Sequence, residues 1–148
     1  VTEPEDRVPV TILTGFLGAG KTTVLNRILR GDHGLRLAVI QNEFGEVGVD
    51  HLLTAEHVSA DATVFQMNNG CLCCTVRSDL APLVERLCAS QADHGRLDGI
   101  VVETTGLALP GPVLRTFLQD APSVLTRVDA VITLVDAYNV GRHLALAR

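Results

Sequence analysis

Short apolar runs alternate with polar or glycine-containing segments along the chain. The runs predict five strands, at residues 8–14, 37–40, 63–67, 98–102 and 128–135. Helical spacing of apolar residues, or a proline near the start, predicts helices at 22–30, from Ser78 or Asp79 onward, and at 111–118. This alternation predicts an α/β fold with a mostly parallel sheet and helices on both of its faces.

The apolar positions of the first two predicted helices indicate which side faces the core. The first helix carries Val24, Leu25, Ile28 and Leu29 on one side. The second helix carries Leu80, Leu83, Val84, Leu87 and Cys88. Pro82 is expected in the first turn of the second helix, where its missing N–H costs little. Cys88 is expected to be an inert core residue because it lies on the apolar face.

A glycine-rich segment joins the first predicted strand to the first predicted helix. Its sequence, Gly15-Phe16-Leu17-Gly18-Ala19-Gly20-Lys21-Thr22-Thr23, fits the phosphate-loop pattern G-x-x-x-x-G-K-[ST] in full. Glycines let backbone N–H groups curl around phosphate oxygens, and the helix N-terminus favours the same anion. Lys21 can reach the outer phosphates, and the Thr22 hydroxyl can bind Mg²⁺. An ordinary glycine turn is the alternative. The expected nucleotide-binding residues are Gly15, Gly18, Ala19, Gly20, Lys21, Thr22 and Thr23.

The fourth predicted strand leads into Glu103-Thr104-Thr105-Gly106. In phosphate-loop proteins, a carboxylate at such a strand end holds Mg²⁺ directly or through water. The glycine after it can present its backbone N–H to the terminal phosphate. A polar strand end in a solvated loop is the alternative, but the phosphate loop upstream favours catalytic roles for Lys21, Glu103 and Gly106.

Residues 42–50 follow the second predicted strand and carry three carboxylates, Glu43, Glu46 and Asp50. Open α/β sheets bind ligands at the carboxyl ends of their strands. We interpret this segment as a switch loop that senses Mg²⁺ and the γ-phosphate, with Glu43 as the candidate metal-facing carboxylate. A solvated acidic loop is the alternative.

Three of the four cysteines lie in Cys71-Leu72-Cys73-Cys74. Thiolates suit Zn²⁺, and three of them leave one tetrahedral position open. Glu43, a histidine such as His51 or His57, or water could fill it. The spacing is not the paired C-x-x-C of a structural zinc finger, so we expect transient metal binding. Buried inert cysteines are the alternative, whereas a Cys73–Cys74 disulfide would be strained.

The length of 148 residues suits one domain with a sizeable core. A net charge of −5 without a basic stripe argues against a nucleic-acid partner. No apolar run approaches the roughly 20 residues of a membrane helix, and residues 1–7 form a polar lead-in rather than a signal peptide. We therefore expect a cytoplasmic protein with no membrane partner.

Four segments occur together in a recognisable order. They are residues 15–23, Asn42-Glu43-Phe44-Gly45-Glu46, Gly70-Cys71-Leu72-Cys73-Cys74 and Glu103-Thr104-Thr105-Gly106-Leu107-Ala108. In this combination the chain resembles the CobW-type P-loop GTPases of the CobW/HypB/UreG group, relatives of the hydrogenase and urease nickel-insertion GTPases. The resemblance covers essentially the whole chain, and its C-x-C-C element is the most discriminating part.

The resemblance implies a SIMIBI-type, three-layer P-loop fold and the activity of a GTP-dependent metallochaperone. Members use GTP binding and hydrolysis to control the transfer of a metal to a client protein or cofactor-synthesis enzyme. The implied ligands are GTP or GDP, Mg²⁺ at Thr22, and Zn²⁺ or Co²⁺ at Cys71, Cys73 and Cys74. Hydrolysis is expected to be slow, because no arginine finger or water-positioning glutamine is evident in the sequence.

The chain also departs from the pattern of this family. It reads Ala108-Leu109-Pro110 where many members have Ala-Asp-Pro. The guanine-reading Asn-Lys-x-Asp element and the C-terminal domain of the family are not found. We therefore expect residues 1–148 to be the N-terminal part of one GTPase domain, truncated on its C-terminal side, and the preference for guanine rests on the resemblance.

Two other functions compete with this one. A small-molecule kinase would share the nucleotide loop, but it usually has a lid with arginines, and residues 107–127 contain only Arg115 and Arg127. A non-catalytic zinc-storage or redox-switch domain would carry a vestigial nucleotide loop.

Overall fold

The computed structural model describes residues 6–42, 62–67, 75–89, 91, 95–106, 109–119 and 122–146. Its strands are β1 (Val8–Gly15), β2 (Leu37–Asn42), β3 (Ala62–Met67), β4 (Gly99–Glu103) and β5 (Thr126–Leu134). Its helices are α1 (Lys21–Leu29), α3 (Thr75–Ala89), α5 (Pro110–Gln119), α6 (Pro122–Leu125) and α7 (Val140–Leu146). The predicted strands and helices are all present, with limits that differ by a few residues.

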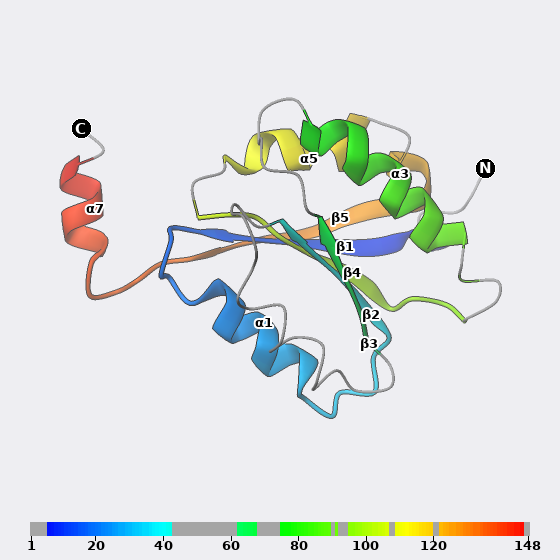
Figure 1. Ribbon diagram of the computed structural model, residues 1–148, viewed down its shortest axis with the longest axis horizontal. Helices are drawn as coiled ribbons and strands as arrows, with labels where there is room; N and C mark the ends of the chain where they lie inside the picture. Colours follow the sequence, from blue (N-terminus) through cyan, green and yellow to red (C-terminus); the bar gives the residue numbers. More distant parts are fainter. Residues whose placement is uncertain are drawn as a thin grey trace.

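The strands form one five-stranded sheet in the order β3-β2-β4-β1-β5, and all of its pairings are parallel (Figure 1). From β1 the chain crosses to β2 on one side, and from β4 it crosses to β5 on the other. The neighbours β1 and β4 therefore flank the point at which the direction of winding changes. Open α/β sheets bind ligands outside the carboxyl ends of the strands at this point.

The helices cover the sheet on both faces, so the molecule has three layers. Helix α1 lies on one face, while α3 and α5 lie on the other (Figure 1). Helix α7 lies beyond the sheet, at the left of the same view. The α/β prediction, with a parallel sheet between helices, is confirmed.

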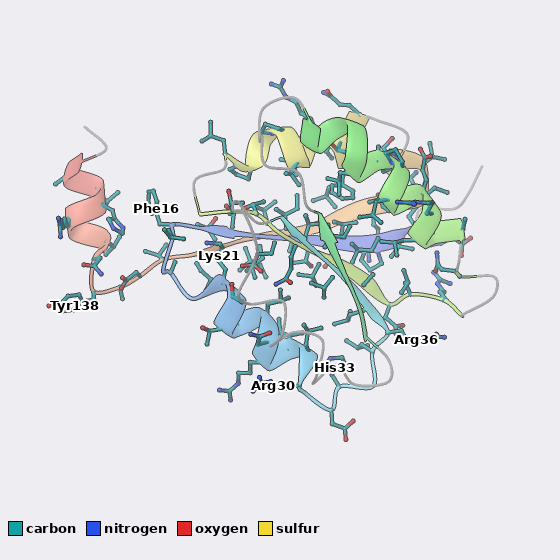
Figure 2. All side chains as sticks on the ribbon, in the orientation of Figure 1. Phe16, Lys21, Arg30, His33, Arg36 and Tyr138 are labelled. Atoms are coloured by element: carbon teal, nitrogen blue, oxygen red, sulfur yellow. The ribbon has the colours of Figure 1, made fainter. Side chains whose placement is uncertain are left out.

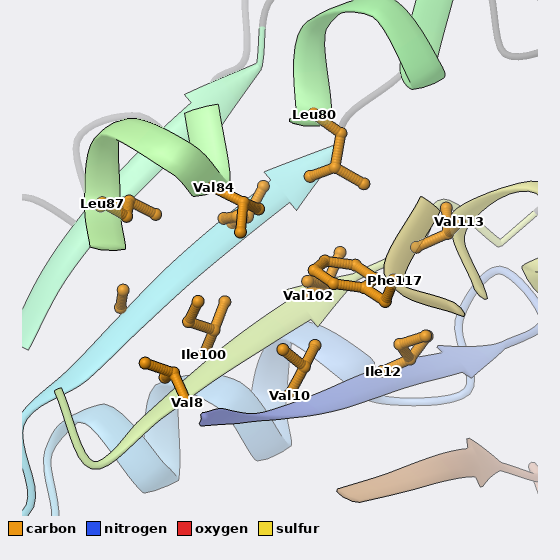
Figure 3. Packing of buried hydrophobic residues seen from close by; sticks show 12 residues of the cluster. Val8, Val10, Ile12, Leu80, Val84, Leu87, Ile100, Val102, Val113 and Phe117 are labelled. Atoms are coloured by element: carbon orange, nitrogen blue, oxygen red, sulfur yellow. The ribbon is translucent and has the colours of Figure 1, made fainter. Parts of the chain in front are cut away.

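Two apolar clusters hold the layers together. The larger one lies between the sheet and helices α3 and α5 (Figure 3). Its buried members are Val8, Val10, Ile12, Ala38, Ile40, Leu80, Val84, Leu87, Ile100, Val102, Val113 and Phe117. The smaller cluster lies beneath α1 and contains Leu13, Leu25, Leu29, Val39 and Val101. Every residue of β4 is buried, because this central strand is covered on both faces.

The start of α3 differs from the prediction. The helix begins at Thr75, so Pro82 lies in its interior rather than in its first turn. Thr75, Ser78 and Asp79 are all residue types that favour helix starts, so the sequence leaves the position of the first turn ambiguous. Inside a helix, the proline ring removes one backbone hydrogen bond.

The buried stripe of α1 is narrower than predicted. Leu25 and Leu29 are buried, whereas Val24 and Ile28 are each 37% exposed. Helices α6 and α7 were not predicted, because segments this short hold too few turns to show a helical period. No helix in the described part of the chain is long and apolar enough to span a membrane.

Candidate nucleotide-binding site

The glycine-rich loop connects β1 to α1 at the carboxyl edge of the sheet. Gly18 and Gly20 adopt φ values of 78° and 92°, which residues with a Cβ rarely adopt. The N–H of Ala19 donates to the carbonyl of Phe16 at 3.1 Å and closes the turn. Gly20 is the N-cap of α1 and supplies no side-chain cap. The first N–H groups of α1, which have no acceptor within a helix, are thus left for a ligand.

Lys21 lies over the loop rather than in solvent, and it is only 7% exposed (Figure 2). Its Nζ donates to the carbonyl of Gly15 at 2.8 Å and to that of Phe16 at 3.1 Å. An ammonium group has three protons, so one remains for an anion held by the loop. The two carbonyls fix the position of the charge over the loop.

Glu103 links the start of α1 to the end of β2. The Thr22 hydroxyl donates to Glu103 Oε1 at 3.0 Å, and Gln41 Nε2 donates to Glu103 Oε2, also at 3.0 Å. Glu103 is 7% exposed, so its charge lies within the site. Two residues that the sequence analysis expected near Mg²⁺ for separate reasons, Thr22 and Glu103, are thus in direct contact.

Sequence reasoning did not single out Gln41. The signal that could have found it is a polar residue that directly follows the apolar run Leu37-Ala38-Val39-Ile40. In a parallel sheet such a residue reaches the same edge as the other strand ends. Its partner depends on strand order, which the sequence leaves open.

Gly106 packs directly on the phosphate loop. A Cβ at this position would overlap the backbone nitrogen and Cα of Leu17. The preceding segment is anchored to β1, because the N–H of Thr104 donates to the carbonyl of Leu13 at 2.9 Å. The structure thus brings the two glycine-containing motifs of the sequence into contact.

The residues present fit a phosphate group accompanied by a divalent cation. The N-terminus of α1 and the Lys21 ammonium offer positive charge and donors to an anion. Because Thr22 gives its proton to Glu103, the lone pairs of its oxygen are left for a cation. Thr105 Oγ1 is buried and has no partner within the described residues, as expected of a group that a ligand or water completes.

The predicted soft-metal site lies outside the described residues. This applies to Cys71, Cys73, Cys74 and Glu43, and also to His51 and His57. Within the described ranges, no three His, Cys, Asp or Glu side chains are grouped so as to hold a metal ion. Cys88 is half-buried against the larger cluster, and burial raises the pKa of its thiol. Its environment agrees with the inert role predicted for it.

Comparison with known proteins identifies the family. Residues 9–145 match the profile of the CobW/HypB/UreG nucleotide-binding domain. The chain belongs to this family. The CobW/HypB/UreG resemblance seen in the four motifs is therefore confirmed.

Similar proteins include zinc chaperones of bacteria and a GTPase of yeast. The chain is 46% identical over 137 residues to the zinc chaperone CobW of Pseudomonas aeruginosa, covering 88% of this chain and 36% of that protein. It is 42% identical over 142 residues to the zinc chaperone YjiA of Escherichia coli, covering 93% and 43%. It is 42% identical over 143 residues to the zinc-regulated GTPase metalloprotein activator 1 of Schizosaccharomyces pombe, covering 94% and 34%.

Solved structures of a relative share the fold. The Zn(II)-bound YjiA GTPase from E. coli superposes with a TM-score of 0.67 at 34% identity, covering 95% of this chain and 44% of that one. A Zn(II)-bound triple mutant of the same GTPase superposes with a TM-score of 0.70 at 33% identity. The fold is thus that of a P-loop GTPase, and the chain spans less than half the length of these relatives.

Proposed function

We propose that this CobW-family chain binds GTP with Mg²⁺ at the β1–α1 loop, hydrolyses it, and couples the nucleotide state to the handling of Zn²⁺ or a similar ion such as Co²⁺. The observation that carries the proposal is the convergence of Lys21, Thr22 and Glu103 on an uncapped helix N-terminus. Relatives that are named zinc chaperones and zinc-regulated GTPases support the choice of guanine and of zinc.

The residues of the loop are proposed to stabilise charge during phosphoryl transfer. Water attacks the γ-phosphorus, and the bond to the β–γ bridging oxygen breaks to give GDP and inorganic phosphate. Lys21 and the loop N–H groups would hold the outer phosphate oxygens, and the N–H of Gly106 would contact the terminal phosphate. Mg²⁺ bound at Thr22 would neutralise the negative charge of the phosphates.

The metal is proposed to be cargo, held by the thiolates of Cys71, Cys73 and Cys74 with Glu43 as a candidate fourth ligand. If the metal and the nucleotide influence each other, each must change the affinity of the other by the same factor. The proposed recipient is a metal-requiring client protein or cofactor-synthesis enzyme in the cytoplasm.

Nucleotide binding tests the first half of the proposal. Fluorescent GTP and ATP analogues are titrated into the protein at its full natural length. We expect GTP to bind more tightly than ATP, and Lys21→Ala to weaken GTP binding by about 100-fold because it removes the buried ammonium. Phosphate release into water, with no acceptor molecule, separates a GTPase from a small-molecule kinase. Unchanged GTP binding in the Lys21 variant would overturn the proposal.

Zinc competition with a chelating dye tests the second half. We expect Cys73→Ser to weaken Zn²⁺ binding by about 100-fold, because it removes one thiolate ligand. Cys88→Ser is the matched control and should change the affinity by less than about twofold, since that half-buried thiol, with its raised pKa, is a poor thiolate donor. Zn²⁺ affinities that are equal with GDP and with a GTP analogue would rule out the coupling.

A further inference from the structure

Gln41 is a buried polar side chain at the carboxyl end of β2. It is 2% exposed, and Val39, two residues earlier on the same face of the strand, belongs to the apolar cluster beneath α1. A buried amide in such surroundings is unfavourable unless it is hydrogen-bonded. The bond from Gln41 Nε2 to Glu103 Oε2 satisfies this requirement at 3.0 Å.

The pairing of strands puts Gln41 beside Glu103 with no intervening residue. In the parallel register of β2 and β4, Gln41 lies directly opposite Glu103. The two carboxylate oxygens of Glu103 therefore have partners from different elements, Thr22 on α1 and Gln41 on β2. The terminal torsion of a glutamate is otherwise broad, so a partner on each oxygen limits the rotation of the carboxylate.

We infer that Gln41 is a positioning residue for the cation side of the nucleotide site. By holding Oε2 of Glu103, it keeps Oε1 where it accepts the Thr22 proton, and this leaves the lone pairs of Thr22 for Mg²⁺. Gln41 acts through Glu103 and needs no contact with the nucleotide. The inference rests on the proposed function, in which Thr22 binds Mg²⁺ together with GTP.

The alternative is that Gln41 only fills space in the sheet. Gln41→Met separates the two roles, because it keeps a side chain of similar length and removes the donor. Binding of a fluorescent GTP analogue is measured with the full natural chain, first without Mg²⁺ and then at increasing Mg²⁺. We expect the Mg²⁺ concentration for half-saturation to rise about tenfold, as is common when a partner of a metal ligand is lost. Affinity without Mg²⁺ should change by less than about twofold.

Thr116→Val is the matched control. Thr116 is fully buried on α5 and its hydroxyl donates to the carbonyl of Pro112 at 3.3 Å, so this variant also loses one side-chain hydrogen bond. It lies outside the nucleotide site, and its Mg²⁺ half-saturation should equal that of the wild type. Thermal unfolding of both variants reports the loss of stability separately. Gln41→Asn, whose shorter amide falls short of Glu103, is measured as a second variant and should change Mg²⁺ dependence in the same direction.

A double-mutant cycle with Glu103→Gln decides whether Gln41 acts through Glu103. We expect Gln41→Met to have no further effect on Mg²⁺ half-saturation in the Glu103→Gln background. An equal effect in both backgrounds would overturn the inference, and so would an unchanged Mg²⁺ dependence in the single variants. A wild-type protein that binds GTP without any dependence on Mg²⁺ would instead overturn the proposed function on which the inference rests.

Discussion

Strands β4 and β5 pair with opposite sides of β1, and they differ sharply in burial. Ile12 of β1 lies opposite Val102 on one side and Val131 on the other. Val102 is 2% exposed, whereas Val131 is 45% exposed. The two valines occupy equivalent places in two apolar runs, so the difference comes from the helices that cover β4 and from the position of β5 at the edge of the sheet.

Glu103, the last residue of β4, and Asp136, two residues beyond the end of β5, differ in the same way. Glu103 is buried and bridges Thr22 and Gln41, which come from two other elements. Asp136 instead accepts hydrogen bonds from its own turn, from Asn139 Nδ2 at 2.6 Å and from the Tyr138 N–H at 3.0 Å. A carboxylate after an apolar strand thus becomes part of a candidate site only where neighbouring elements converge on it.

The largest expected contrast is between Glu103→Gln and Asp136→Asn. The first change removes the charge beside Thr22, and we expect Mg²⁺-dependent GTP hydrolysis to fall by about 100-fold. The second change alters a local turn and should alter hydrolysis by less than about twofold. Phosphate release at saturating GTP measures both. Similar losses of hydrolysis in the two variants would contradict the expectation that Glu103 serves the nucleotide site and Asp136 does not.

The next contrast is between two glycines. Gly106 lies three residues after the end of β4, and Gly141 lies in α7, the helix that follows β5. An alanine at Gly106 would overlap the backbone of Leu17, so it must displace the phosphate loop, and we expect GTP binding to weaken at least about tenfold. Gly141 has nothing within 4 Å of the added Cβ. Because it lies in α7, Gly141→Ala should raise the free energy of unfolding by up to about 1 kcal/mol and leave GTP affinity unchanged. Nucleotide titration and denaturant unfolding check the two expectations, and equal GTP affinity in the two variants would contradict them.

The two valines opposite Ile12 test whether the difference in burial between β4 and β5 is reflected in stability. Val102→Ala leaves a cavity in the larger cluster and should lower the free energy of unfolding by about 2 kcal/mol. Val131→Ala, on the exposed edge, should lower it by less than about 0.5 kcal/mol. Urea denaturation of both variants measures the difference. A cost at Val131 equal to that at Val102 would mean that β5 is covered in solution.

The smallest expected effect concerns the pH dependence of stability. The side-chain amide of Asn139, followed by the Tyr138 N–H, lowers the pKa of Asp136 below its ordinary value of 3.8. A lowered pKa in the folded state adds stability that is present above the unfolded pKa and is lost as the pH falls through the folded pKa. The stability difference between wild type and Asp136→Asn should therefore be constant near neutral pH and shrink below about pH 4. A difference that grows on acidification would contradict this assignment.

The sequence predicted most of the fold and several members of the candidate site. The apolar runs located the strands because a buried strand needs a continuous apolar segment. The phosphate-loop pattern located Lys21 and Thr22 because glycines and the following lysine occupy fixed positions along one short segment. The sequence predicted Thr22 and Glu103 separately as residues near Mg²⁺, and the structure adds that the two side chains are in hydrogen-bond contact. The roles of Cys71, Cys73, Cys74 and Glu43 stay predictions.

What the sequence determined by itself is local: the strand runs, the glycine loop, and the carboxylates that end two apolar strands. The structure decided which of these features meet. It placed β4 between β1 and β2, and this order alone puts Gln41 and Thr22 on the two oxygens of Glu103. By contrast, Asp136 accepts a hydrogen bond from Asn139 in its own turn. Strand β5 lies at the edge of the sheet, and among the described residues no strand lies beyond it to supply another partner. Such contacts join residues that are far apart in the chain, and no local pattern of residues encodes their distance in space.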